Sequence, residues 1–299
     1  MAVHTTTSAT IIINPIAGGG TVSAAERNAE LSLAIAEHHG VTAEVFVTTH
    51  VGHARELARA AVGRGAQLVM AWGGDGTINE VASALVGSDV ALGIVPAGSG
   101  NGLARELGID THPRKAIADA LHAPPQRIDV GEIEGRYFVN TAGIGFDAHI
   151  ASRFATARRR GFLGYAGITA RALTSYVPLE YRVLVPGRHA REVRAVLLTI
   201  ANSAQFGNGA LIAPGARVDD GELDLVVFQE RSRFHTVCAL PRLFTGTVNR
   251  VAGCTITRVR DVTIEATVSL TYHLDGEPVA GGTTLHARVH PAALRVAVN

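Results

Sequence analysis

Cysteine is scarce in this sequence, because only Cys238 and Cys254 occur among its 299 residues. Two cysteines exclude a disulfide framework and a CxxC-type metal site, and they are typical of a protein from a reducing cytoplasm. No apolar run reaches membrane-spanning length. The first residues also lack the basic segment and apolar core of a signal peptide, so we expect a cytoplasmic protein.

Charge and motif patterns exclude further classes. The formal net charge of +1 gives no reason to expect nucleic acid as a partner. The 13 histidines show no HExxH spacing, and no GxxxxGK followed by Ser or Thr is present. What the chain does contain is 47% hydrophobic residues, 18% charged residues and 33 glycines, which indicates an ordered globular protein. Its length allows two domains.

The strongest functional signal is the glycine-rich stretch Gly73–Thr77. It follows an apolar run at Gln67–Ala71, predicted to be a buried parallel strand, and precedes an amphipathic run at Thr77–Val86, predicted to be a helix. Glycines at such a turn expose backbone N–H groups, and the helix dipole favours an anion there. Asp75 inside a phosphate loop implies Mg²⁺ or a role in proton handling. The alternative is an ordinary turn in which Asp75 and Thr77 are N-cap residues.

Two more glycine-rich loops follow predicted strands, at Asn14–Gly20 and Pro96–Gly102. Thr49 lies at the carboxyl end of another predicted strand, Ala43–Thr49. Because the carboxyl ends of parallel strands meet at one edge of a sheet, we expect these loops to converge. Their convergence predicts a nucleoside triphosphate site. The G-x-G in the third loop does not continue into a dinucleotide fingerprint.

The second half of the chain has a different pattern of predicted secondary structure. Ala123–Pro125 marks a predicted boundary between residues 1–125 and residues 126–289, and short strands predominate after it. Asn140–Asp147 is predicted to be another glycine turn. The basic stretch Arg153–Arg171 is either a solvated face or a lip that approaches anionic lipid.

Together the motifs resemble the diacylglycerol kinase catalytic-domain family, which includes soluble bacterial diacylglycerol kinases, related bacterial lipid kinases, and the sphingosine and ceramide kinases. The matching segments are Asn14-Pro15, 73–80, 96–101, 213–214, 219–224 and 274–277. The resemblance implies an N-terminal phosphofructokinase-like α/β domain with a parallel sheet that binds ATP. It also implies a C-terminal β-rich, sandwich-like domain, and a tail at 290–299 that returns to the first domain.

The resemblance also implies roles for individual residues. Glu277 would be the general base and Asp75 the organiser of Mg²⁺ and phosphates. The resemblance to the sphingosine kinases places the base in the glycine loop instead, so Asp75 is the competing candidate for that role. The implied nucleotide contacts are Asn14, Pro15, Gly18, Thr49, Gly73, Gly74, Gly76, Thr77, Glu80, Ser99 and Asn101. A structural Mg²⁺ would be held by the Asp220 carboxylate and by the backbone carbonyls of Arg217 and Glu222.

One position departs from the bacterial pattern. Gly102 stands where the bacterial diacylglycerol kinases usually carry an aspartate of the Mg²⁺ network, and the loop is closer to that of the sphingosine kinases. The expected activity is Mg²⁺-dependent transfer of the ATP γ-phosphoryl group to a primary hydroxyl of a lipid, diacylglycerol or sphingoid-like, during transient membrane contact. The alternatives are an NAD kinase-like enzyme and an inactive lipid- or nucleotide-binding protein. The acceptor lipid and the oligomeric state stay open, with a homodimer as one option.

Overall fold

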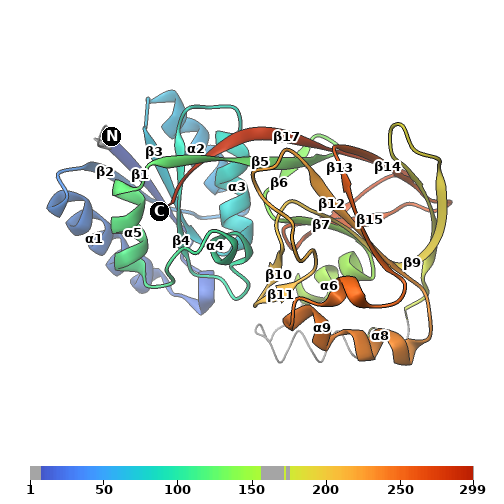
Figure 1. Ribbon diagram of the computed structural model, residues 1–299. Helices are drawn as coiled ribbons and strands as arrows, with labels where there is room; N and C mark the ends of the chain where they lie inside the picture. Colours follow the sequence, from blue (N-terminus) through green and yellow to red (C-terminus); the bar gives the residue numbers. More distant parts are fainter. Residues whose placement is uncertain (1–7, 156–171, 173–175, 299) are drawn as a thin grey trace. The chain divides into compact units, whose positions relative to one another are not determined.

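The computed structural model describes residues 8–155, 172 and 176–298. The chain forms two compact units (Figure 1). The first unit runs to Ile128 and includes the chain again from Ala292, and the second unit is Asp129–Pro291. The three arginines of the predicted basic lip, at 158–160, lie outside the described residues.

The first unit is built on a parallel sheet in the order β4-β3-β1-β2. Its strands are β1 (Ser8–Ile13), β2 (Thr42–Val47), β3 (Leu68–Gly73) and β4 (Ala91–Pro96). All residues of β3 and β4 are buried, as expected for central parallel strands covered on both faces.

Helices cover both faces of this sheet (Figure 1). They are α1 (Val22–His38), α2 (His53–Gly63), α3 (Asp75–Leu85) and α5 (Pro113–His122), with the short α4 (Gly102–Glu106) and a 3-10 turn at Ala17–Gly19. Helices α1 and α5 pack together over a core that includes Ile11, Met70 and Trp72. Helices α2 and α3 pack together on the sheet as the second pair.

The end of the chain adds a further strand to the first unit. Strand β17 (Thr284–Ala297) pairs in parallel with β4 through Arg295 and Val296. Its earlier residues pair with a strand of the second unit, β14 (Asp261–Glu265). Strand β5 (Pro125–Ile133) likewise begins in the first unit and ends in the second.

The second unit is rich in antiparallel strands. Its sheet runs β16-β15-β7-β9-β8-β14-β17, with β12 pairing with both β9 and β13, and β5 pairing with β6 and β17. The further strands are β6 (Arg136–Phe138), β7 (Thr141–Gly145), β8 (Leu179–Leu184), β9 (Arg191–Ala201), β10 (Gln205–Gly207), β11 (Ala210–Leu211), β12 (Leu223–Gln229), β13 (Cys254–Val259), β15 (Thr271–Leu274) and β16 (Glu277–Ala280). The helical segments are α6 (Phe146–Ala155), α8 (Arg233–Ala239), α9 (Pro241–Phe244) and a 3-10 turn at Val248–Arg250.

This architecture confirms the predicted α/β unit with parallel strands followed by a β-rich unit. One local prediction was wrong, because residues 140–147 form the strand β7 followed by the start of α6, and not a glycine turn. Position 143 of this strand requires glycine, because a Cβ there would overlap the side chains of Asp147 and His273. Among the described residues, no helix has the length and apolar character needed to cross a membrane.

Candidate functional site

The three glycine-rich loops of the first unit meet at the carboxyl edge of its sheet. They follow the neighbouring parallel strands β1, β3 and β4. A Cβ on Gly98 would lie 2.6 Å from the Cα of Gly74, and one on Gly18 would lie 2.6 Å from the carbonyl oxygen of Ala97. The loops therefore touch backbone to backbone, which only glycine permits at Gly18 and Gly98.

Asn14 ties the first loop to the second. Its side-chain amide donates a hydrogen bond to the Thr77 hydroxyl at 2.9 Å, and its Oδ1 accepts one from the N–H of Ile16 at 3.1 Å. Thr77 is buried in the first turn of α3, where its side chain fills the space beside Gly73. These contacts make Asn14 and Thr77 parts of the loop framework.

Asp75 joins the second loop to the third. Its Oδ2 accepts a hydrogen bond from the N–H of Asn101 at 2.9 Å, and its Oδ1 accepts one from the N–H of Gly102 at 2.7 Å. Asn101 takes a left-handed conformation with φ +50°, and its amide bonds both the N–H and the carbonyl of Gly98. The third loop is thereby closed on itself and held by Asp75.

Glu80 holds the loop after β2 through hydrogen bonds to its backbone. Its carboxylate accepts hydrogen bonds from the N–H groups of Gly52 and Ala54, at 2.8 and 3.1 Å, at the start of α2. Thr49 in the same loop is exposed, and its hydroxyl lies 3.0 Å from Nδ1 of His50 and 3.1 Å from Nδ1 of His53. These bonds make Glu80 a cap for α2, and its expected contact with the nucleotide stays a prediction.

Backbone donors remain for an anionic ligand at this edge. The N-cap of α3 is Gly74, and among the described residues no side chain caps this helix. Ser99 and Gly18 are exposed at the tips of their loops. Uncapped N–H groups at the positive end of a helix, near an exposed hydroxyl donor, suit phosphate oxygens.

The arrangement of the side chains around these loops bears on whether they could hold the predicted Mg²⁺. Within the described ranges, no group of three or more His, Cys, Asp or Glu side chains gathers in a way that could hold a metal ion. Asp75 is a single carboxylate, and its oxygens accept hydrogen bonds from the N–H groups of Asn101 and Gly102. Mg²⁺ in phosphotransferases is held by one or two carboxylates together with the substrate phosphates. Asp75 therefore fits Mg²⁺ only with a bound nucleotide.

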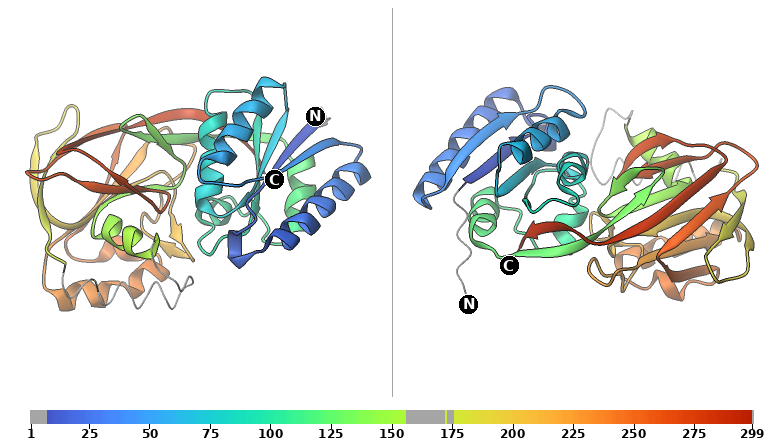
Figure 2. Two further views of the ribbon diagram at one scale, coloured as in Figure 1. Left: turned by 180° about the vertical axis from the view of Figure 1, so that it is seen from behind. Right: turned by 90° about the horizontal axis from the view of Figure 1, so that it is seen from above.

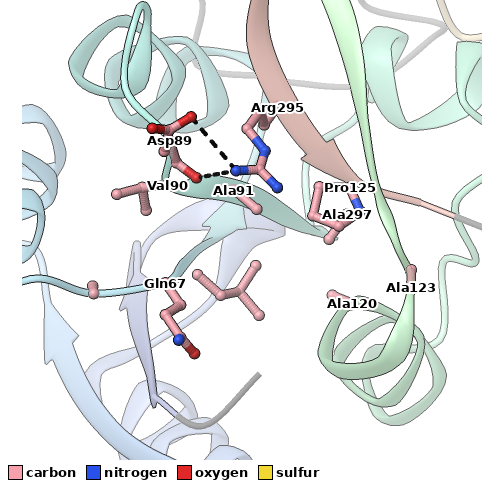
Figure 3. A pocket seen from close by; sticks show the side chains of 11 residues that line it. Gln67, Asp89, Val90, Ala91, Ala120, Ala123, Pro125, Arg295 and Ala297 are labelled. Atoms are coloured by element: carbon pink, nitrogen blue, oxygen red, sulfur yellow. Dashed lines mark hydrogen bonds and ion pairs between the residues drawn. The ribbon is translucent and has the colours of Figure 1, made fainter. Parts of the chain in front are cut away.

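A separate pocket of about 260 Å³ opens at the opposite edge of this sheet, where β3 and β4 begin (Figure 3). Arg295 enters it from β17 and donates a hydrogen bond to the carbonyl oxygen of Asp89 at 2.8 Å. The pocket is lined largely by alanines and other small side chains. None of the predicted site residues lines this pocket, so it is separate from the glycine loops.

In the second unit, Glu277 is the first residue of β16 and directly follows a tight turn. Asp275 and Gly276 have φ of +48° and +91° and form the two-residue turn between β15 and β16. The buried Asp275 carboxylate accepts three hydrogen bonds, each 2.9 Å long, from the N–H groups of Val139, Asn140 and Thr141. Glu277 itself is exposed. Sequence reasoning recognised the Asp-Gly turn but missed the part that Asp275 plays in fixing it.

A buried histidine–aspartate pair lies directly behind this turn. His273 Nε2 is 2.9 Å from Asp147 Oδ2, and both side chains are 4% exposed. The N–H of Gly276 donates to Nδ1 of His273 at 3.2 Å. Burial lowers the pKa of His273, but Asp147 and, as a further charge, Asp275 raise it, so that the resulting pKa lies above the ordinary histidine value. The only sequence signal for this pair was a histidine, His273, between Tyr272 and Leu274 in a predicted strand.

The acidic turn predicted to hold a structural Mg²⁺ already has a cation nearby. Arg258 Nη1 lies 3.8 Å from both Asp220 Oδ2 and Glu222 Oε2. Arg217 directs its guanidinium to Asp219. The buried Asp129, which sequence reasoning missed, accepts a hydrogen bond from the N–H of Gly221 at 2.7 Å. Arg258 thus balances the carboxylates of this turn, and the metal stays a prediction.

Comparisons with known proteins cover almost the whole chain. Residues 8–133 match the model described as "Diacylglycerol kinase catalytic domain", and residues 140–298 match that of the "YegS C-terminal NAD kinase beta sandwich-like domain". The chain is 32% identical to a diacylglycerol kinase of Mycobacterium tuberculosis, over 98% of this chain and 96% of the relative. It is 34% identical to a protein of Chromohalobacter salexigens named "Probable lipid kinase YegS-like", over 78% and 77%.

The fold is also shared with solved structures. A crystal structure of a diacylglycerol kinase from Bacillus anthracis aligns over 99% of this chain and 98% of that chain, with a TM-score of 0.74. The sequence identity is 19%, so this likeness concerns the fold.

Proposed function

Because the chain belongs to the diacylglycerol kinase and YegS-like lipid kinase family, we propose that it transfers the γ-phosphoryl group of ATP to a primary hydroxyl of a membrane lipid. Membership of a kinase family implies ATP as the phosphoryl donor. The observation that carries the proposal is the convergence of three glycine loops around Asp75, at the edge where parallel sheets bind nucleotides. The match of both halves of the chain to lipid-kinase domains supports a lipid acceptor.

The first unit binds the phosphates of ATP. The N–H groups at the start of α3, the exposed Gly18 loop and the Ser99 hydroxyl donate to phosphate oxygens. Asp75 would hold Mg²⁺ together with these phosphates, and the metal would supply neutralisation of the negative charge at the phosphoryl group. Asn14, Thr77 and Glu80 act indirectly, because their hydrogen bonds hold the loops in place.

Glu277 accepts the proton of the lipid hydroxyl. An alcohol is barely ionised at neutral pH, and a positioned carboxylate that takes its proton is worth about 10²–10⁴ in rate. Glu277 is exposed to solvent directly after a turn that Asp275 holds, so it can meet an incoming hydroxyl. Asp75 is the less available base, because its carboxylate already accepts hydrogen bonds from two backbone N–H groups.

The test combines product detection with two variants. Purified protein is incubated with ATP, Mg²⁺ and a total lipid extract, and phosphorylated lipids are detected by mass spectrometry, with NAD as a parallel acceptor. We expect a phosphorylated lipid, its loss on chelation of Mg²⁺, and no phosphorylated NAD. Phosphorylation of NAD alone would refute a lipid acceptor.

The variants then assign the base. Glu277→Gln should lower kcat by about 10²–10⁴ while nucleotide binding, measured by calorimetry, stays intact. Asp75→Asn should weaken the binding of ATP with Mg²⁺. Full activity of Glu277→Gln beside an inactive Asp75→Asn would transfer the role of base to Asp75.

A further inference from the structure

The buried pair of His273 and Asp147 takes no part in the mechanism proposed above. Both side chains are 4% exposed, so two ionisable groups are removed from water. Such burial costs free energy that an apolar pair of the same size would not cost. Stability alone therefore does not account for the pair, and its hydrogen bonds lead to the turn before Glu277.

Two elements hold the pair in place. His273 lies in β15, and Asp147 lies in the first turn of α6, where the positive end of a helix favours a carboxylate. Helix α6 packs against β7, β15 and β16, so the pair joins this helix to the sheet (Figure 1 and Figure 2). Gly143 of β7 leaves the space that the pair occupies. The Thr199 hydroxyl donates a hydrogen bond to Asp147 Oδ2 at 3.3 Å, which helps to orient the carboxylate.

The two polar partners of the imidazole select one neutral tautomer. A carboxylate only accepts hydrogen bonds, so Nε2, which lies 2.9 Å from Asp147 Oδ2, carries the ring proton. Nδ1 is then an acceptor, and the N–H of Gly276 donates to it at 3.2 Å. Because the bond at one ring nitrogen decides the proton at the other, Asp147 keeps His273 ready to accept from Gly276.

Gly276 connects this acceptor to Glu277. It is the second residue of the turn between β15 and β16, with φ +91°, and its peptide leads directly into Glu277. The first residue of the turn, Asp275, is held by the backbone N–H groups of residues 139–141. Both residues of the turn are thus fixed, and His273 fixes the one that adjoins Glu277.

We propose that His273, oriented by Asp147, is a positioning residue for Glu277. Its Nδ1 holds the N–H of Gly276 and so fixes the backbone from which the Glu277 carboxylate meets the lipid hydroxyl. The imidazole is buried and exchanges no proton with the substrate. A misplacement of about 1 Å can cost about 10²-fold in rate, so the hold on this turn acts on kcat. This inference rests on the proposed function, in which Glu277 is the general base.

Two substitutions of His273 separate its two hydrogen bonds. In His273→Asn the amide oxygen takes the place of Nδ1 and can still accept from Gly276. In His273→Gln the amide nitrogen takes the place of Nε2 and can still donate to Asp147, but Gly276 loses its acceptor. His273→Gln should lower kcat by about 10–100-fold with the KM for ATP and for lipid unchanged, whereas His273→Asn should stay within about 2-fold of wild type.

The pH dependence of kcat provides a second readout. A charged imidazole carries protons on both nitrogens, so its Nδ1 no longer accepts. The charged groups that act on His273 are Asp147 from α6 and Asp275 from the turn, and both raise its pKa. Gly143 from β7 and Phe206 from β10, which also face the ring, carry no charge. The kcat of the wild type should fall as the pH drops through this raised pKa, and His273→Asn should lack that fall because an amide does not titrate there.

Nitrogen NMR tests the contact without any measurement of activity. Above the raised pKa, His273 should show a protonated Nε2 and an unprotonated Nδ1, with its signals assigned by their absence in His273→Asn. The N–H of Gly276 should exchange slowly with solvent in wild type and in His273→Asn, and faster in His273→Gln. Asp147→Leu removes the acceptor of the Nε2 proton, so a protonated Nδ1 should appear in that variant.

Ile264→Ala is the matched control for lost stability. Ile264 is fully buried in the core cluster that also contains Tyr272 and Leu274, but it lies in β14, which pairs with β8 and β17. Its truncation leaves a cavity in the same unit and keeps the hydrogen bonds of the turn. This variant should keep the kcat of the wild type. Circular dichroism and urea unfolding check that every variant is folded and compare the variants in stability.

The outcomes separate this inference from the proposed function. If the wild type phosphorylates no lipid, the proposed function fails, and exchange of the Gly276 N–H that depends on His273 still supports the contact. If the wild type is active, a wild-type kcat in His273→Gln overturns the inference. An equal loss of kcat in His273→Asn and His273→Gln also overturns it, because the acceptor at Nδ1 would then be irrelevant. A proton on Nδ1 of the neutral imidazole in the wild type would overturn it as well.

Discussion

Asp275→Asn tests whether one buried carboxylate holds the turn that carries Glu277. The substitution keeps the size and the left-handed conformation, which asparagine tolerates as well as aspartate does. An amide retains one acceptor oxygen for the N–H groups of Asn140 and Thr141, but it turns an NH₂ group toward the N–H of Val139. The variant therefore changes the hydrogen bonding and little else.

The expected cost follows from these contacts. Loss of a charge-assisted hydrogen bond costs about 1.5–3 kcal/mol, and an unpaired buried N–H costs about 1–3 kcal/mol more. We expect Asp275→Asn to lower the free energy of unfolding by about 3–5 kcal/mol, which is a large part of the 5–15 kcal/mol typical of whole proteins. Asp219→Asn is the matched control, because its ion pair with Arg217 is exposed and worth about 1 kcal/mol or less.

The assay is urea unfolding followed by two signals. Trp72 is the only tryptophan and lies in β3, so its fluorescence reports the first unit, while far-ultraviolet circular dichroism reports both units. Asp275→Asn should shift the dichroism transition more than the fluorescence transition. If Asp275→Asn is no less stable than Asp219→Asn, the three hydrogen bonds do not hold the turn and the reasoning is refuted.

Three further predictions concern other contacts. His273→Gln should lower the free energy of unfolding most below the ordinary histidine pKa of 6.5, because the neighbouring carboxylates stabilise the charged imidazole. The loss should become smaller as the pH rises through the raised pKa of His273 in the folded state. A difference in urea midpoints that does not depend on pH would contradict this. Gly98→Ala should weaken nucleotide binding measured by calorimetry, since its Cβ would lie 2.6 Å from the Gly74 Cα. Gly63→Ala at the end of α2 meets nothing within 4 Å and should leave binding unchanged, so equal losses would mean that loop contact is irrelevant. Glu80→Ala should lower the melting temperature through a loss of about 0.5–2 kcal/mol, because it removes the cap of α2, and unchanged melting would show that the cap contributes nothing.

Local patterns in the sequence were sufficient for the order of the elements. The apolar run that became β3 is short and continuous, and the helix that follows has apolar residues at helical spacing, so neighbouring residues alone decide both. The glycines between them carry the same local signal, because a tight strand-to-helix turn needs a backbone that other residues rarely adopt. The predicted α/β unit followed by a β-rich unit came from such patterns.

The partners of the polar side chains could be known only from the tertiary structure. Asp75 bonds the N–H groups of Asn101 and Gly102, which lie 26 and 27 residues further along the chain, and Asp275 bonds Val139 across 136 residues. No local period encodes such distances, because they depend on which strands become neighbours. The sequence determined that Asp75 lies in a glycine-rich turn between a strand and a helix and that an Asp-Gly turn precedes Glu277. The fold decided that both aspartates hold other loops in place, since only strand pairing brings those backbone donors to them.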